Sequence, residues 1–141
     1  MRLVLDTNVF ISGVFFSGPP FDILNAWRTD KVEIVISPEI LDEYRRVGDE
    51  LAEHYPKIEL APFLELLVAK APIIHVPSLD ERICSDPDDD KFLACALAGQ
   101  TKFICSGDKA LLKISGYRGI NVITPRGFVD RYLQKKRKPL G

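Results

Sequence analysis

Four carboxylates occupy positions in this sequence from which they could do chemistry together. They are Asp6, Glu43, Asp90 and Asp108. Carboxylate oxygens are the ligands that Mg²⁺ and Mn²⁺ prefer, and clustered negative charges need such a cation to offset their repulsion. A bound dication polarises a phosphoryl oxygen and holds the attacking and leaving oxygens in line. If the four acids converge, the sequence predicts a site that acts on phosphate esters.

Two of these acids follow apolar runs of strand length. Asp6 comes directly after Leu3–Leu5, and Asp108 follows a second run across a two-residue turn. Ligands of open parallel α/β sheets bind at the carboxyl ends of the strands, where both acids are expected to lie. Each acid could instead turn the chain or cap a helix with its short side chain, and this alternative stays open.

Glu43 lies in a stretch of helical periodicity that begins at the capping pattern Ser37-Pro38. A helical wheel at about 100° per residue places Glu43 beside Ile40 and Val47 on the buried side. A carboxylate at the margin of an apolar stripe needs a partner or an ion to offset its lost hydration. We therefore expect Glu43 to face the site, with an ion pair to Arg or Lys as the alternative.

Asp90 stands at the start of a helix that is apolar nearly all round. The wheel aligns it with Leu93 and Leu97, so we expect Asp90 to point into the protein. Asp88 and Asp89 are expected to project elsewhere and to complement the helix dipole from the first turn. The alternative is that Asp90 is simply the third acid of that turn.

The elements that must position these acids follow an alternating pattern. Apolar runs of strand length alternate with stretches of helical periodicity, which predicts an α/β fold with a parallel sheet and crossover helices. Strands are expected near Leu3–Leu5, Glu33–Ile36, Ile73–Val76, Phe103–Cys105 and Val122–Ile123. Helices are expected from Phe21, over Pro38–Leu51 and Phe63–Ala71, from the Asp86-Pro87 cap to Ala98, over Lys109–Lys113 and from Pro125.

Length and composition fit one soluble domain. The chain has 141 residues, 46% of them hydrophobic and 28% charged, which is ordinary for a compact domain with its own core. We expect a single domain over residues 1–134 and a basic, mobile tail over 135–141. Asp6 interrupts the first apolar run early, so we expect the start of the chain to be neither a signal peptide nor a membrane span, and the protein to be cytoplasmic.

The net charge of −1 argues against a generic polyanion binder. Four acids held by metal no longer repel a phosphate chain, however, and the remaining charges are then slightly positive. The cysteines Cys84, Cys95 and Cys105 form no CxxC pair and are expected to be reduced and structural. His54 and His75 lack ligand spacing, so the sequence gives no support for a zinc site.

Four blocks of the sequence resemble a PIN domain in order, spacing and flanking residues. They are Leu3–Asn8, Ser37–Glu43, Asp86–Ala94 and Ser106–Lys109. The closing segment Ile123–Phe128 resembles the end of a subgroup described as toxin components of toxin–antitoxin pairs. The resemblance covers essentially the whole chain. It implies a three-layer α/β/α sandwich around a parallel sheet.

The resemblance also implies a function and roles for particular residues. It implies an acidic pocket for Mg²⁺ or Mn²⁺, an endoribonuclease that leaves 5′-phosphate and 3′-hydroxyl ends, and a small antitoxin partner, with a homodimer as a further option. Carried over by motif, the catalytic and metal-binding residues are Asp6, Glu43, Asp90 and Asp108, and the supporting residues are Asn8 and Ser106. Ser106 stands where many relatives have Thr, and Ala110 stands where close relatives often have an acid.

Two competing functions remain. An aspartyl-phosphate phosphohydrolase needs a proton donor two residues after its nucleophile, and Asn8 cannot supply one. A catalytically silent PIN fold that binds RNA or protein would be marked by a lost acid, and all four are present. The tail residues Lys135, Lys136, Arg137 and Lys138 either contact RNA phosphates or only keep the terminus solvated.

Overall fold

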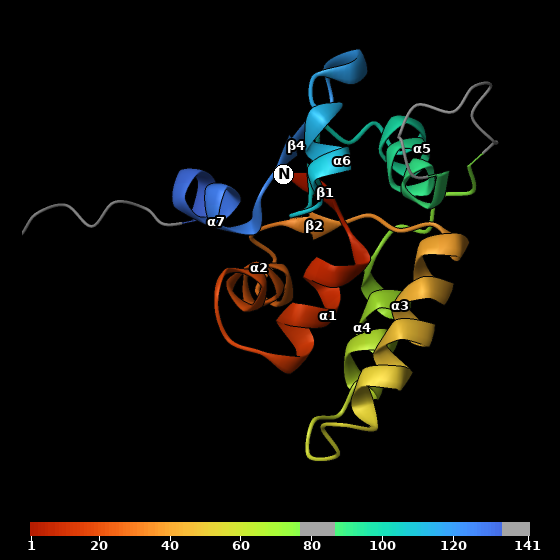
Figure 1. The fold of residues 1–141 in the computed structure, drawn as a ribbon, viewed down its shortest axis with the longest axis vertical. Coiled ribbons are helices and arrows are strands. Elements are labelled where there is room, and N and C mark those ends of the chain that lie inside the picture. The colour runs from red at the N-terminus through yellow and green to blue at the C-terminus, as the bar shows by residue number, and fades with distance from the viewer. Residues whose placement is uncertain (77–86, 134–141) are drawn as a thin grey trace, which may run out of the picture.

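A parallel sheet runs through the middle of the molecule (Figure 1). The computed structural model describes residues 1–76 and 87–133. The strands are β1 (Arg2–Leu5), β2 (Glu33–Ile34), β3 (Phe103–Cys105) and β4 (Asn121–Ile123), in the order β2-β1-β3-β4. All three pairings are parallel. Residues Leu3, Val4 and Leu5 of the central strand β1 are fully buried, as expected for a sheet covered on both faces.

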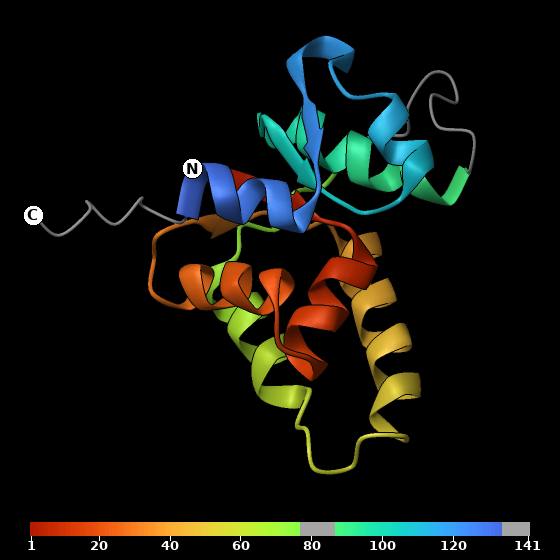
Figure 2. The same cartoon turned by 60° about the vertical axis from the view of Figure 1, so that its left-hand side comes forward.

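Helices form a layer on each side of this sheet. One side carries α1 (Thr7–Phe15), α2 (Pro19–Arg28), α3 (Pro38–Ala52) and α4 (Ala61–Lys70), and the other carries α5 (Asp90–Ala98) and α6 (Lys109–Lys113) (Figures 1 and 2). Short 3₁₀ turns occupy Pro87–Asp89 and Tyr117–Gly119, and α7 (Pro125–Phe128) continues into a π-helical turn, Val129–Leu133. The three-layer α/β fold predicted from the sequence is confirmed.

Two predicted helix starts have the expected caps. The Ser37 hydroxyl accepts a hydrogen bond from the Ile40 N–H at 3.3 Å, and proline occupies the first turn of α3. The Thr124 hydroxyl accepts from the Gly127 N–H at 3.1 Å at the start of α7. Each hydroxyl satisfies an N–H that the helix itself leaves without a partner. The cap at Ser37 fixes where α3 begins, and therefore where Glu43 lies on it.

The predicted strand Ile73–Val76 is wrong. Ile73 forms only an isolated parallel bridge with Ile36, supported by the Ile74 N–H, which donates to the Ile36 oxygen at 2.7 Å. Strand β2 itself ends at Ile34, two residues earlier than expected. The pairing cannot continue because Ser37 follows Ile36 directly and already caps α3. The edge of the sheet is therefore shorter than the apolar runs indicated.

Helix α1 was not predicted, because Asp6-Thr7-Asn8 looks like a turn after a strand. The helix begins at once, with the Asp6 oxygen accepting from the Val9 N–H at 3.0 Å and from the Phe10 N–H at 3.1 Å. Most of its side chains are buried against the rest of the core. An apolar stretch without a polar face carries no helical periodicity, which explains why the sequence pattern did not reveal it.

Helix α5 is buried, as its apolar composition predicted, with Phe92, Leu93 and Cys95 almost inaccessible. Cys95 and Cys105 are free and buried, and loss of hydration raises the pKa of the Cys95 thiol to about 12. Cys84 lies outside the described residues. In the part of the chain that the structure describes, no single helix could cross a membrane. Only α1 and α2 together reach the required length and composition, and they are bent by 86°.

Candidate active site

Asp6 and Ser106 meet because of the strand register. Leu5 of β1 pairs with Cys105 of β3, so the residues that follow them are neighbours at the carboxyl end of the sheet. The Asp6 N–H donates to the Cys105 oxygen at 2.9 Å and extends the pairing by one bond. The Ser106 hydroxyl donates to Asp6 Oδ2 at 2.6 Å, and Ser106 is fully buried. The orientation of the Asp6 carboxylate is thus held by the neighbouring strand.

The same hydroxyl connects Asp6 to Asp108. Ser106 Oγ accepts from the Asp108 N–H at 2.9 Å, so it bridges the two acids. Asp108 Oδ1 accepts from the Ala110 N–H at 2.9 Å and caps α6. The cap that the sequence left open as an alternative is therefore present. It uses one carboxylate oxygen of Asp108, which remains at the carboxyl end of the sheet.

Three carboxylates share one electrostatic environment around Asp6. The Asp6 side chain is 7% exposed, and burial is the main cause of its raised pKa. Hydrogen bonds from the Ser106 hydroxyl and the Thr7 N–H act in the opposite direction, while the negative charges of Asp108 and Glu43 raise the pKa further. Asp6, Glu43 and Asp108 come from separate elements, and the structure brings them within electrostatic reach of one another.

Glu43 faces inward from α3, as the helical wheel predicted, with 19% of its side chain exposed. Its Oε2 accepts a hydrogen bond from the Thr7 hydroxyl. Its Oε1 lies 3.0 Å from Lys91 Nζ and 3.7 Å from Arg46 Nη2. The alternative of an ion pair with Lys or Arg is therefore realised in this structure. Glu43 is both directed toward Asp6 and already paired.

Lys91 joins the start of α5 to this acidic region. Its side chain is 13% exposed, and Nζ donates to the Asp88 oxygen at 2.6 Å in addition to its contact with Glu43. The ammonium also lies 5.0 Å from the centre of the Phe92 ring. A lysine this buried is not a solvated surface charge, because its ammonium is held by an acid, a carbonyl and an aromatic ring.

The run of acids before α5 differs from the prediction. Asp89 is the buried one, at 7% exposed, whereas Asp90 is half-buried and Asp88 is exposed. Pro87–Asp89 form a 3₁₀ turn, which advances by about 120° per residue, so a wheel drawn at the α-helical angle misplaces Asp89. Asp90 begins α5 itself, next to Lys91. The ammonium of that lysine contacts Glu43.

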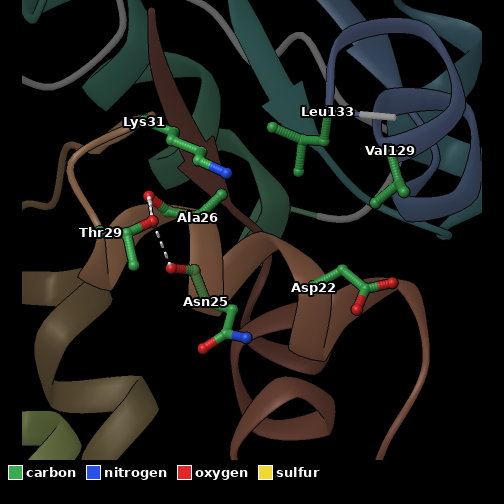
Figure 3. A pocket seen from close by; sticks show the side chains of 7 residues that line it. All are labelled: Asp22, Asn25, Ala26, Thr29, Lys31, Val129 and Leu133. Atoms are coloured by element: carbon green, nitrogen blue, oxygen red, sulfur yellow. Dashed lines mark hydrogen bonds between the residues drawn. The ribbon is translucent and has the colours of Figure 1, made fainter. Parts of the chain in front are cut away.

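A hollow of about 350 Å³ lies between α2 and the π-helical turn (Figure 3). Its lining includes Asp22, Lys31 and Leu133, and the Thr29 hydroxyl at its rim donates to the Asn25 oxygen at 3.0 Å. None of the four acids that the sequence singled out contributes to it. The carboxyl end of the sheet, and not this hollow, is the candidate active site.

Comparison with known protein families gives one match. The family model described as PIN domain matches residues 2–110. The chain belongs to the PIN-domain family. The match runs from β1 into α6 and includes all four acids. A search of curated proteins finds no match. The toxin subgroup stays a prediction.

PIN domains have a nuclease-type fold and typically use divalent metals. The donor chemistry of Asp6, Glu43 and Asp108 fits Mg²⁺ or Mn²⁺, because all three offer carboxylate oxygens. Their present arrangement fits less well: among residues 1–76 and 87–133, no group of three or more His, Cys, Asp or Glu side chains is gathered closely enough to hold an ion. In this structure the oxygens of Glu43 contact Thr7 and Lys91 instead.

Of the two residues expected to support the acids, Ser106 is buried and bonds to Asp6, whereas Asn8 lies at the surface. Asn8 is exposed, and its side chain makes no hydrogen bond with the described residues. Thr7, one position earlier, is buried and bonds to Glu43 instead. Sequence reasoning also missed Lys91, although a lysine within an apolar helix is a signal that could have identified it. The basic tail 135–141 lies outside the described residues.

Proposed function

We propose that this PIN domain is a metal-dependent endoribonuclease and the toxin of a toxin–antitoxin pair. The observation that carries the nuclease proposal is the electrostatic coupling of Asp6 with Glu43 and Asp108 at the carboxyl end of a parallel sheet. The negative charges of Glu43 and Asp108 raise the pKa of the buried Asp6, and this arrangement is costly unless a cation compensates it. RNA is the proposed substrate, because PIN nucleases in general bind RNA.

The proposed division of labour follows from the contacts. Asp6, Glu43, Asp90 and Asp108 are the proposed ligands of Mg²⁺ or Mn²⁺. When bound, the ion supplies positive charge to the phosphate that is attacked and to the leaving oxygen. Ser106 holds Asp6 through one oxygen, at 2.6 Å, and thereby fixes its orientation before the substrate arrives. Thr7 holds Glu43 in the same way.

The toxin role rests on the resemblance of the closing segment Ile123–Phe128. We propose a small antitoxin protein that blocks cleavage, and a homodimer as a further option for the assembled state. The test is inhibition: a small protein encoded beside this gene, added to the purified protein, should suppress RNA cleavage at equimolar concentration. A neighbouring product that neither binds nor inhibits would remove the toxin role and leave the nuclease proposal standing.

One observation favours a second candidate, a PIN fold that binds RNA or protein without cutting. Both oxygens of Glu43 already have partners, one of them a nearly buried lysine. Because the Lys91 ammonium already offsets the charge of Glu43, the site can be stable without metal. This candidate predicts RNA binding that is the same in Mn²⁺ and in EDTA, with no cleavage in either.

The deciding experiment is cleavage of single-stranded RNA in Mn²⁺, Mg²⁺ and EDTA. We expect cleavage with either metal, none in EDTA, and 5′-phosphate ends on the products. Asp6→Asn and Asp108→Asn should each abolish it. Asp22→Asn is the matched control. Asp22 is an exposed carboxylate at the hollow of Figure 3, so its substitution makes the same chemical change away from the site. RNA that is bound but never cut would support the silent binding module.

A further inference from the structure

Lys91 is the feature of this site that neither the sequence motifs nor the proposed reaction explains. Its ammonium has two acceptors at hydrogen-bonding distance, Glu43 Oε1 at 3.0 Å and the Asp88 oxygen at 2.6 Å. The second contact ties the ammonium to the start of its own helix. These two contacts together hold the Lys91 ammonium in position at Glu43.

Arg46 also approaches Glu43, but the two cations are not equivalent. The Arg46 contact is longer, at 3.7 Å, and its side chain is 66% exposed. A hydrated arginine on the outer face of a helix gives little stability and moves away at small cost. Lys91 is 13% exposed, so its charge is only weakly screened by water. The charge of Glu43 is offset mainly by Lys91.

A dication at this site and the Lys91 ammonium would oppose each other. Both are positive, and both would be held by the Glu43 carboxylate. Repulsion between like charges a few ångströms apart in a partly buried site is large compared with thermal energy.

We propose that Lys91 is a built-in competitor of the divalent ion: it compensates Glu43 in the metal-free protein, and metal binds only as the Lys91–Glu43 pair opens. This inference rests on the proposed metal-dependent function and adds a regulatory residue to it. Lys91 is a positioning residue in this scheme, because it acts through Glu43. As a consequence, the protein binds the divalent ion more weakly than the same carboxylates would without Lys91.

The test is Mn²⁺ binding by titration calorimetry to the full-length wild type, Lys91→Gln and Lys91→Arg. We expect Lys91→Gln to bind Mn²⁺ about tenfold tighter, which corresponds to about 1.4 kcal/mol. Lys91→Arg keeps the positive charge and should stay close to wild type. In EDTA, Lys91→Gln should melt at a lower temperature than wild type, because Glu43 loses its partner. Its metal-induced rise in melting temperature should be larger.

A matched control separates this effect from a general change in charge. Lys70 forms an ion pair with Asp30 at 2.6 Å, is 25% exposed, and lies with the N-terminal residues of β1, at the opposite end of that strand from Asp6. Lys70→Gln removes the same charge and should leave the dissociation constant for Mn²⁺ unchanged. Equal tightening in both variants would overturn the proposal. If Lys91→Gln fails to fold, Lys91→Met takes its place in the experiment, because methionine keeps an apolar side chain next to the Phe92 ring.

The outcomes also separate this inference from the proposed function. If wild type and Lys91→Gln bind Mn²⁺ equally well, Lys91 is not a competitor, and the nuclease proposal is unaffected. Weaker binding by Lys91→Gln would mean that Lys91 holds Glu43 in a ligating position, which also overturns the inference. If neither protein binds Mn²⁺, both proposals fall.

Discussion

Ser106 Oγ lies 2.6 Å from Asp6 Oδ2, although the two residues are 100 positions apart in the chain. The contact follows from a single register, Leu5 opposite Cys105, which makes the next residues of both strands neighbours. The serine hydroxyl also accepts a hydrogen bond from the Asp108 N–H. It therefore donates to the Asp6 carboxylate and accepts from the Asp108 backbone at the same time. Among the other side chains of similar size, only threonine offers a hydroxyl with both functions.

Ser106→Ala should therefore destabilise the protein. The change leaves a buried carboxylate oxygen and the Asp108 N–H without this partner, and such losses cost about 1–3 kcal/mol. Urea unfolding in EDTA measures the effect directly. Ser106→Thr keeps the hydroxyl and serves as the control, with a smaller loss. RNA cleavage should fall in Ser106→Ala more than in Ser106→Thr. Equal unfolding midpoints for wild type and Ser106→Ala would show that the bridge contributes nothing.

Asp6→Asn should stabilise the metal-free protein at neutral pH. The pKa of Asp6 is raised in the folded state above its ordinary value of 3.8, mainly by burial. The folded protein therefore binds this proton more tightly than the unfolded chain does, and the stability this provides is lost as the pH rises through the folded pKa. At neutral pH the charged Asp6 is a cost that asparagine removes.

The measurement is the melting temperature of both proteins in EDTA as a function of pH. The advantage of Asp6→Asn should be a few degrees at neutral pH and should shrink as the pH falls toward 3.8, where wild-type Asp6 is protonated. A difference that stays constant with pH would mean that the Asp6 charge is not its cause.

Asp90→Asn should abolish RNA cleavage and leave the fold intact, because asparagine keeps the shape but removes a negative ligand. Asp89→Asn is the informative partner variant, since Asp89 is the more buried of the two. We expect Asp89→Asn to lower the melting temperature while cleavage per folded molecule persists. The reverse result, with activity lost only in Asp89→Asn, would transfer the metal-binding role to Asp89.

Mg²⁺ or Mn²⁺ should raise the melting temperature of the wild type. A ligand that binds only the native state adds about 2.7 kcal/mol of stability at 100 times its dissociation constant. Asp108→Asn should reduce the rise, and potassium chloride at equal ionic strength should not reproduce it. An increase of the same size in wild type and Asp108→Asn would place the ion elsewhere on the protein.

Deletion of residues 135–141 should weaken RNA binding and flatten its dependence on salt. The four basic residues of this tail would act through counterion release, which weakens as salt rises. Which bond is cut should not change, because phosphate contacts position the substrate without reading bases. Identical salt slopes for the truncated and full-length proteins would identify the tail as a solubilising terminus only.

The sequence predicted those parts of the site that depend on strand ends and on a regular helix. Asp6 and Asp108 follow strands, and parallel pairing is enough to bring strand ends to one edge of a sheet. Glu43 lies well inside a long helix with a clear cap, so the wheel at the α-helical angle gave its direction correctly. These features are local, and the sequence carries them directly.

The parts that could not be predicted depend on irregular backbone or on contacts between distant segments. Asp89 is buried because a 3₁₀ turn precedes α5, and no residue in that run marks the change of helix type. Thr7 and Lys91 acquire their importance only from Glu43, which reaches them from α3. A polar residue in an apolar stretch indicates that a partner exists, but only the three-dimensional packing shows which one.

The 100-residue separation between Asp6 and Ser106 has a consequence for synthesis. At about 5–20 residues per second, β3 leaves the ribosome roughly 5–20 seconds after β1. During this interval Asp6 has neither the strand that orients it nor the hydroxyl that bridges it to Asp108, because closing so long a loop must await both ends. A nascent chain on the ribosome is surrounded by ribosomal RNA. At this stage it already contains Asp6, but the assembled site does not yet exist.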